Sequence, residues 1–325
     1  MVNMEEASLE ERIVKLLPLG KRLSGEFLAQ QLGVSRVAVW KCVRRLRKRG
    51  VKIKSGREGY LLDSAADILL PFYLRSRLEG RTIGRNLVYR DMMVSTQTVG
   101  RKLADGGEKE GAVVLAEAQS ASYGRLGRPW VSARGGLWFT VILRPDLPPT
   151  SLQAFNYMAS LSVYSTLRAD LGVDAWLKWP NDVFVRGDKV CGIISEAAAT
   201  SDSIRYVLLG VGLNVNNEMA EVGPGPYRAA SMAALLGRFV DRNELLVSIL
   251  TEMDSRYAGI RREGITRVVR EYSSRCATLG RRVKVILGDR SFEGVVAGIN
   301  DEGALEVDTG KGITRVYAGD VVHLR

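Results

Sequence analysis

Two stretches of the sequence combine residue types that suit a phosphorylated ligand, and the first is the loop QSASYGRLGRPW. Gly124 and Gly127 free the backbone of this loop. Arg125 and Arg128 carry forked donors three residues apart, and Trp130 adds a large aromatic face. Such a loop suits an anionic phosphate with an aromatic base nearby, although its composition fits a basic surface loop equally well.

The second stretch reads KWPND from Lys178 to Asp182 and continues with KVCG from Lys189. Pro180 at the end of a strand forces a turn, which presents Asn181 and Asp182 at the strand's edge. Lys189 begins a strand that runs antiparallel to the one after Asp182. We therefore expect Lys189 and Asp182 to reach the same site.

The sequence lacks the residues that several catalytic mechanisms require. His323 is the only histidine, so a Ser-His-Asp or Cys-His arrangement has no base. Cys42, Cys191 and Cys276 stand far apart without C-x-x-C spacing, which argues against a structural zinc and a disulfide framework; Cys191 is expected in the core. Neither a Rossmann nor a P-loop fingerprint occurs. The chemistry must come from Lys, Arg, Asp, Glu, backbone amides or an imported metal.

The elements that position these residues belong to a long chain, for which we expect three domains at 1–66, 67–275 and 276–325. The central one has many strand patterns and two long helical patterns, at 151–169 and 242–258, which predicts an α+β fold with a mixed sheet. Its expected strands are 87–94, 112–117, 137–143, 175–179, 183–186, 190–196 and 206–215. The last of these carries GVGLN, where glycine marks the close approach of another backbone or of a ligand.

The formal charge of +11 is concentrated in one segment. Residues 35–62 hold ten Lys/Arg against the single acid Glu58, a net of +9, which is typical of a surface for a polyanion. Apolar spacing predicts three helices here, with Ser24 and Ser35 as N-caps and Gly33 as the stop between them.

A hairpin with its turn at 55–56 is expected to follow the third helix. Helix, helix, tight turn, basic helix and hairpin is the order of a winged helix-turn-helix, which favours DNA binding over a merely solvated basic helix. Trp40 is expected to pack against the wing. The expected DNA contacts are Arg36, Val37, Lys41, Arg44 and Arg45.

The last part of the chain repeats short strand patterns separated by turns, which predicts a small β-barrel. These strands are expected at 283–287, 292–299, 304–307, 313–317 and 321–324. Elsewhere no apolar run reaches the roughly 18 residues that span a bilayer, and no secretory signal opens the chain, so we expect a cytoplasmic protein with no membrane partner.

Together, the arginine loop, the KWPND turn, the Lys-x-x-Gly of Lys189 and Gly192 and the GVGLN strand resemble the biotin protein ligases in order and spacing. With a winged helix in front and a β-rich tail behind, the chain is similar over its whole length to the members that also repress the biotin operon. Two departures stand out: Ser122 and Tyr123 replace the family's first Gly-Arg pair, and Gln97 follows Ser-Thr where Asn is usual.

The resemblance implies an SH3-like tail and a reaction in two steps. Biotin and ATP give biotinyl-adenylate and pyrophosphate, and a lysine of a biotin carboxyl carrier protein then displaces AMP. An already ionised carboxylate attacks an anionic phosphorus, so positive groups and Mg²⁺ are needed and a general base is not. A chain with one histidine near its end fits this chemistry.

The resemblance also implies roles for individual residues. Lys189 would bridge biotin's carboxylate and the α-phosphate, Arg125 would hold phosphate oxygens, and Asp182 would hold Mg²⁺ or orient the incoming lysine. The last strand would approach the nucleotide, with Asp320 and Arg325. Biotin is assigned to Ser95, Thr96, Gln119, Tyr123, Lys189 and Gly192, and ATP to Arg125, Arg128, Trp130, Asn181, Lys178, Asn214 and Arg325.

Operator DNA is the implied partner of the basic helix. One winged helix reads too little sequence for specific binding, so we expect a homodimer promoted by biotin and ATP. Two alternatives stay open: a ligand-sensing transcription factor without ligase activity, and a lipoate ligase, which shares the broad fold and reaction.

Overall fold

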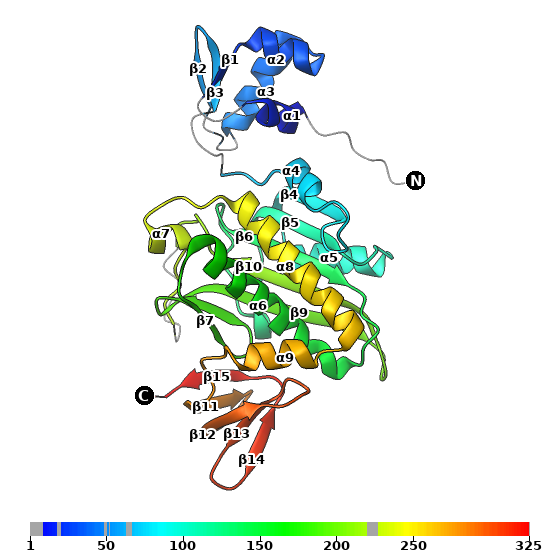
Figure 1. The fold of residues 1–325 in the computed structure, drawn as a ribbon, viewed down its shortest axis with the longest axis vertical. Coiled ribbons are helices and arrows are strands. Elements are labelled where there is room, and N and C mark those ends of the chain that lie inside the picture. The colour runs from blue at the N-terminus through cyan, green and yellow to red at the C-terminus, as the bar shows by residue number, and fades with distance from the viewer. Residues whose placement is uncertain are drawn as a thin grey trace. The chain divides into compact units, whose positions relative to one another are not determined.

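The computed structural model describes residues 9–17, 21–48, 51, 53–62, 67–219 and 227–324, and the chain divides into two compact units (Figure 1). Unit 1 comprises Met1–Ser76 with Asp241–Asn243, and unit 2 comprises Arg77–Val240 with Glu244–Arg325. The two boundaries predicted at 66 and 275 stay predictions.

Unit 1 is a small helical bundle with a three-stranded sheet in the order β1-β3-β2. Its apolar core includes Ile13, Leu28 and Val39, each fully buried and each from a different helix. The elements are α1 (Leu9–Leu16), β1 (Arg22–Leu23), α2 (Gly25–Leu32), α3 (Arg36–Lys48), β2 (Ile53–Gly56) and β3 (Gly59–Leu62), followed by α4 (Pro71–Arg77), which ends at the unit's boundary.

The predicted signals for starting and stopping these helices are confirmed. Ser24 Oγ accepts the Phe27 N–H at 3.0 Å, and Ser35 Oγ accepts the Ala38 N–H at 3.1 Å. Gly33 ends α2 in the left-handed region at φ 66°. The tight turn between the two helices therefore follows from local sequence alone.

The hairpin differs from its prediction in two ways: its turn lies two residues later, and a third strand, β1, pairs with it. Gly56 pairs with Gly59, so the turn lies at Arg57 and Glu58 and not at 55–56. Gly59 has φ 115°, and a Cβ there would lie 2.1 Å from the Leu23 carbonyl oxygen. Strand β1, which the sequence did not reveal, thus requires glycine at the start of β3.

Unit 2 is built on a seven-stranded mixed sheet in the order β4-β5-β6-β10-β9-β8-β7. Only the pair β4 and β5 is parallel. The predicted α+β fold with a mixed sheet is confirmed, and each predicted strand is present with ends that differ by a few residues. The strands are β4 (Asn86–Met93), β5 (Ala112–Gln119), β6 (Leu137–Leu143), β7 (Ala175–Lys178), β8 (Asp182–Val185), β9 (Asp188–Ala199) and β10 (Ile204–Leu213).

The two long helices of unit 2 match their predictions, and Figure 1 shows them crossing in front of the sheet. They are α6 (Leu152–Leu171) and α8 (Arg242–Glu263). Three shorter helices were not predicted: α5 (Thr96–Asp105), α7 (Met232–Leu236) and α9 (Thr266–Ser273).

Helix α5 matters for the site because it lies directly on the sheet. A Cβ at Gly100 would lie 3.2 Å from Thr140 Cγ2, so the glycine lets the helix approach β6 closely. Ser95 is the N-cap of this helix and accepts the Gln97 and Thr98 N–H groups. Ser95 and Thr96, which the family resemblance assigns to biotin, thus lie at the start of a helix.

The C-terminal strands form one antiparallel sheet in the order β14-β13-β12-β11-β15. Strands β14 and β15 are its two edges, so this order does not show the closure of a barrel, and the predicted SH3-like barrel is not confirmed. The strands are β11 (Arg282–Leu287), β12 (Arg290–Ile299), β13 (Leu305–Asp308), β14 (Ile313–Val316) and β15 (Asp320–His323). No helix in the described part of the chain has the length and apolarity that a membrane crossing requires.

Candidate active site

The register of three strands brings the predicted charged residues together. Lys178 on β7 lies opposite Asp182 on β8, and Asp182 lies opposite Gly192 on β9. The Lys189 ammonium comes within 2.6 Å of Asp182 Oδ1, and only a quarter of the lysine side chain is exposed. The expectation that Lys189 and Asp182 reach one site is confirmed by this ion pair.

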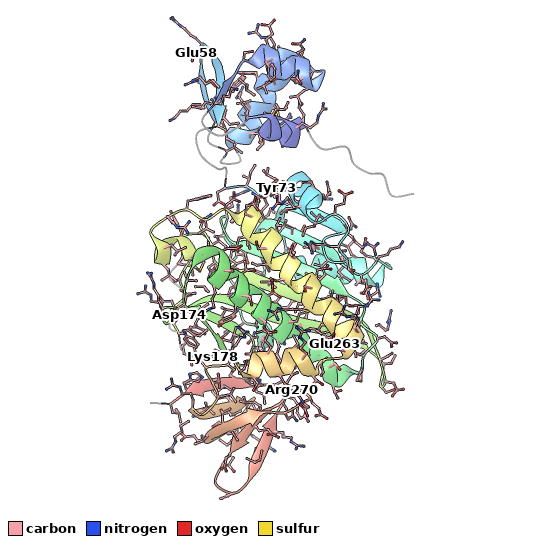
Figure 2. The ribbon with its side chains drawn as sticks, viewed as in Figure 1. Glu58, Tyr73, Asp174, Lys178, Glu263 and Arg270 are labelled. Carbon is pink, nitrogen blue, oxygen red and sulfur yellow. The ribbon has the colours of Figure 1, made fainter. Side chains whose placement is uncertain are left out.

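Lys178 is the most buried cation of the site, with 4% of its surface exposed. Its ammonium donates to the Val321 carbonyl at 2.7 Å and lies 4.5 Å from the centre of the Tyr227 ring. Burial lowers the pKa of Lys178 to about 8, against the opposing effect of Asp182. Figure 2 labels Lys178 near the C-terminal strands. The site thus holds a poorly hydrated positive charge, which acts strongly on a nearby anion.

The arginine loop is a short hairpin. The Gly124 N–H donates to the Arg128 carbonyl at 2.8 Å, and the Trp130 N–H donates to the Ser122 carbonyl at 3.1 Å. Leu126 at the tip has φ 57°, in the left-handed region, and 73% of its surface is exposed. The loop therefore has a defined base and an open tip.

Both arginines of the loop reach the beginning of β15. Arg125 donates to the Gly319 carbonyl at 3.1 Å, and burial lowers its pKa while Asp320 and Asp182 oppose that change. Arg128 forms an ion pair with Asp320. The loop and the C-terminal sheet thus meet where cations outnumber carboxylates. The cations are Arg125, Arg128, Lys178 and Lys189, and the carboxylates are Asp182 and Asp320. Arg325, the other predicted contributor from this end, lies outside the described residues.

Trp130 explains two glycines of the sheet. A Cβ at Gly192 would lie 2.9 Å from Trp130 Cζ3, and a Cβ at Gly212 would lie 2.7 Å from Trp130 Nε1. The close approach to the GVGLN strand is therefore made by this indole side chain and not by another backbone, which was one of the two expectations. Its N–H is buried without a hydrogen-bond partner, and Lys189 Nζ lies 5.4 Å from the ring centre. An unpaired buried donor beside a cation fits a ligand that carries acceptors.

Beside the cations, under α5, lies a buried group of amides and hydroxyls. Gln119 Oε1 accepts the Thr96 N–H at 2.6 Å, and Gln119 Nε2 donates to Ser132 Oγ at 2.9 Å. Thr140 Oγ1 lies 2.9 Å from both Thr96 Oγ1 and Gln97 Oε1. This group, called the amide pocket below, offers donors and acceptors of the kind that a ring with polar edges needs.

The amide pocket contains predicted and missed residues. Thr96 and Gln119 were predicted, whereas Gln97, Ser132 and Thr140 were not. Thr140 had a signal in the sequence, because it is the one polar residue in the apolar strand LWFTVIL. Gln97 had one as well, because it stands where the family has Asn after Ser-Thr, whereas Ser132 had none, since only the fold brings it beside Gln119.

Three other predicted residues have internal contacts. Asn181 Nδ2 donates to the Ile193 carbonyl, and Asn214 Oδ1 accepts from Asn217 at 3.1 Å. The hydroxyl of Tyr123 lies 3.3 Å from a Glu196 carboxylate oxygen. The ligand roles assigned to these three residues stay predictions. Cys191 is fully buried with a raised pKa, as its expected place in the core requires.

Unit 1 presents the other predicted surface. The five expected DNA contacts on α3 are all exposed: Arg36, Val37, Lys41, Arg44 and Arg45. Arg45 forms an ion pair with Glu10 at 2.7 Å, which raises its pKa and gives it a second role within the unit. Trp40 is 47% exposed with Arg44 over its ring at 4.9 Å, so its expected packing against the wing is not confirmed.

A winged helix followed in the chain by a mixed-sheet domain with clustered cations is the arrangement of a ligase that also carries a DNA-binding domain. Models of known protein families agree with this class. Residues 90–214 match the biotin/lipoate A/B protein ligase family, residues 278–324 match the biotin protein ligase C terminal domain, and residues 10–61 match an HTH domain.

Individual relatives narrow the class. The bifunctional ligase/repressor BirA of Bacillus subtilis is 33% identical over 92% of this chain and 93% of its own length. The protein of that name from Escherichia coli is 26% identical over 99% of each chain. The structure of the biotin protein ligase from Aquifex aeolicus in complex with biotin and ATP matches with a TM-score of 0.63 and 27% identity, covering 74% of this chain and 99% of that one. The chain belongs to the biotin protein ligase family.

Proposed function

We propose that this protein ligates biotin to a lysine of a biotin carboxyl carrier protein through biotinyl-5′-adenylate, and that it binds operator DNA as a repressor of biotin synthesis. The observation that carries the ligase part is the pairing of Lys189 with Asp182 beside the arginine loop and the amide pocket. The relatives that span nearly the whole chain carry both activities in their names.

The geometry suits this chemistry because repulsion between two anionic groups is the main barrier to the reaction. Biotin's carboxylate and the α-phosphate are both anionic, and Lys178, Lys189 and the two loop arginines supply positive charge at one place. In a partly buried site these charges are screened less than in water. The chain's one histidine, His323, has a ring nitrogen 3.1 Å from Thr278 Oγ1, and the reaction needs no general base.

The substrates can be placed by their chemistry. The amide pocket, with Thr96 and Gln119, would take biotin's ureido ring, and Lys189 would hold the carboxylate at the pocket's mouth. Ser95 caps α5, and its hydroxyl hydrogen is free to donate to the ring. Gly192 keeps the space that Trp130 occupies. The triphosphate would then lie under Arg125 and Arg128, with Trp130 against the adenine and Asn214 beside it.

Mg²⁺ would enter with the triphosphate. The described residues contain no cluster of three or more His, Cys, Asp or Glu side chains that could hold a metal by themselves. A single carboxylate such as Asp182, completed by phosphates and water, is what Mg²⁺ uses in nucleotide sites. Bound there, it would neutralise charge that shifts to the leaving pyrophosphate.

An exchange assay tests the ligase. ATP/pyrophosphate exchange is measured with biotin, with lipoate and with neither acid. We expect exchange in the presence of biotin and none with lipoate or without an acid. Exchange driven by lipoate would make the protein a lipoate ligase, and no exchange with either acid would leave a ligand-sensing transcription factor.

The repressor and the dimer need their own experiment. We expect biotin plus ATP to shift the protein from monomer to dimer in sedimentation, and the dimer to bind a DNA fragment selected from the promoter of biotin synthesis genes more tightly. Linkage requires that this DNA in turn slows loss of the adenylate. An unchanged monomer fraction would contradict the coupling.

A further inference from the structure

Tyr123 stands where the family loop has arginine, and it joins a contact of three elements. Its hydroxyl lies 3.3 and 3.4 Å from the two oxygens of Glu196 on β9. The guanidinium of Arg101 on α5 lies 3.0 Å from the same carboxylate. The pKa of Tyr123 is raised, by burial first and then by Glu196, so the phenol stays protonated and can donate.

The place of Tyr123 in the loop gives this contact its importance. Tyr123 pairs with Pro129 in an isolated bridge, at the base of the hairpin whose tip carries Arg125 and Leu126. Backbone bonds close the hairpin itself, whereas the contact of Tyr123 with Glu196 ties its base to β9. A contact at the base therefore helps to set the position of both arginines, together with their own contacts to Gly319 and Asp320.

We propose that Tyr123, Glu196 and Arg101 form an anchor that holds the arginine loop over the active site, with Tyr123 as a positioning residue. Phenylalanine at 123 would fill the same place but could not donate to Glu196 as the phenol does. The hydroxyl donates to a charged acceptor over a long distance of 3.3 Å, so its effect lies at the low end for such bonds, and its loss should raise the open fraction of the loop about tenfold. Its effect on the adenylate rests on the proposed function.

Proteolysis measures the anchor without any ligand. Trypsin can cut after Arg125, where the following Leu126 is exposed, whereas Arg128 is followed by proline and resists cleavage. Mass spectrometry then follows the fragments 1–125 and 126–325. We expect Tyr123→Phe to speed this cut about tenfold, and Glu196→Gln to speed it at least as much, because Glu196→Gln also breaks the ion pair with Arg101. The double variant should be no faster than Glu196→Gln alone, because both changes act on the Tyr123–Glu196 contact.

Tyr257→Phe is the matched control. Its hydroxyl also donates to a glutamate, Glu110, at 2.8 Å, but Tyr257 lies on α8. An unchanged cut in Tyr123→Phe overturns the anchor, and so does an equal acceleration in Tyr257→Phe, because the cause would then be general destabilisation.

The consequence for catalysis is measured separately. We expect Tyr123→Phe to release bound biotinyl-adenylate about tenfold faster and to raise the KM for ATP more than it lowers kcat. Equal adenylate release in variant and parent overturns the positioning role. A parent protein that forms no adenylate contradicts the proposed function alone, since the tryptic cut still measures the anchor.

Discussion

Two regions of this protein concentrate positive charge, and they do so in opposite ways. On α3 the cations are exposed along one helix and come from adjacent turns of the sequence. At the edge of the central sheet, Lys178, Lys189 and Arg125 come from separate segments and are largely withdrawn from water. Lysine and arginine side chains thus form an exposed surface charge on α3, whereas in the candidate active site each is held in a defined position.

The difference teaches what each region can do. Exposed charges are screened by salt and attract any polyanion, so their effect is a sum over many weak contacts. Buried charges are screened little, and their pKa values respond to burial, as those of Lys178 and Arg125 do. Each of them therefore matters individually, and its effect depends on geometry.

The largest expected effect comes from a cation of the buried group. Lys189→Ala should lower biotin-dependent ATP/pyrophosphate exchange by roughly 100-fold or more, because a positioned charge is lost where the transition state needs it. The exposed Lys284→Ala serves as control and should change exchange less than twofold, on the order of what surface changes do. Exchange at the parent rate in Lys189→Ala would falsify the assignment.

The second prediction uses the lone histidine, which lies in unit 2. Burial, followed by Lys178 and Arg281, lowers the pKa of His323 to about 4 from its ordinary 6.5. Between these values the unfolded chain binds more protons than the folded one, so the unfolding free energy falls as the pH drops from 6.5 toward 4.

His323→Gln should remove this contribution. Partial exposure lets solvent screen part of the effect, so we expect the parent to lose about 1–2 kcal/mol more than the variant between pH 7 and pH 4.5. Urea unfolding at both values measures the difference. Parallel curves for the two proteins would mean that His323 is protonated in the folded state as easily as in the unfolded one.

The smallest expected effect belongs to a single cation of the exposed group. Lys41→Ala should weaken DNA binding by about 1 kcal/mol and reduce the slope of log affinity against log salt by roughly 0.9, as for one phosphate contact. Arg45→Ala should reduce that slope less, because Arg45 already pairs with Glu10. Binding titrations over a salt series measure both, with exchange activity unchanged. A slope unaltered in Lys41→Ala would remove it from the DNA surface.

Local sequence determined much of this protein. The caps at Ser24 and Ser35 and the stop at Gly33 set the helices of unit 1, because each acts on backbone groups within a few residues. The apolar run of β6 and the long helical patterns of α6 and α8 likewise predicted their own elements. The motifs around Lys189 and Asp182 were close enough in sequence for a hairpin to unite them.

Only the tertiary structure decided the surroundings of those motifs. The burial of Lys178 against Val321, the ion pair of Arg128 with Asp320 and the joining of Thr140 to Gln97 each link segments more than forty residues apart. Local propensity carries no information on such pairs, because they form only when the fold sets the order and register of the strands. Burial follows from the same packing, and with it the lowered pKa values of Lys178 and His323.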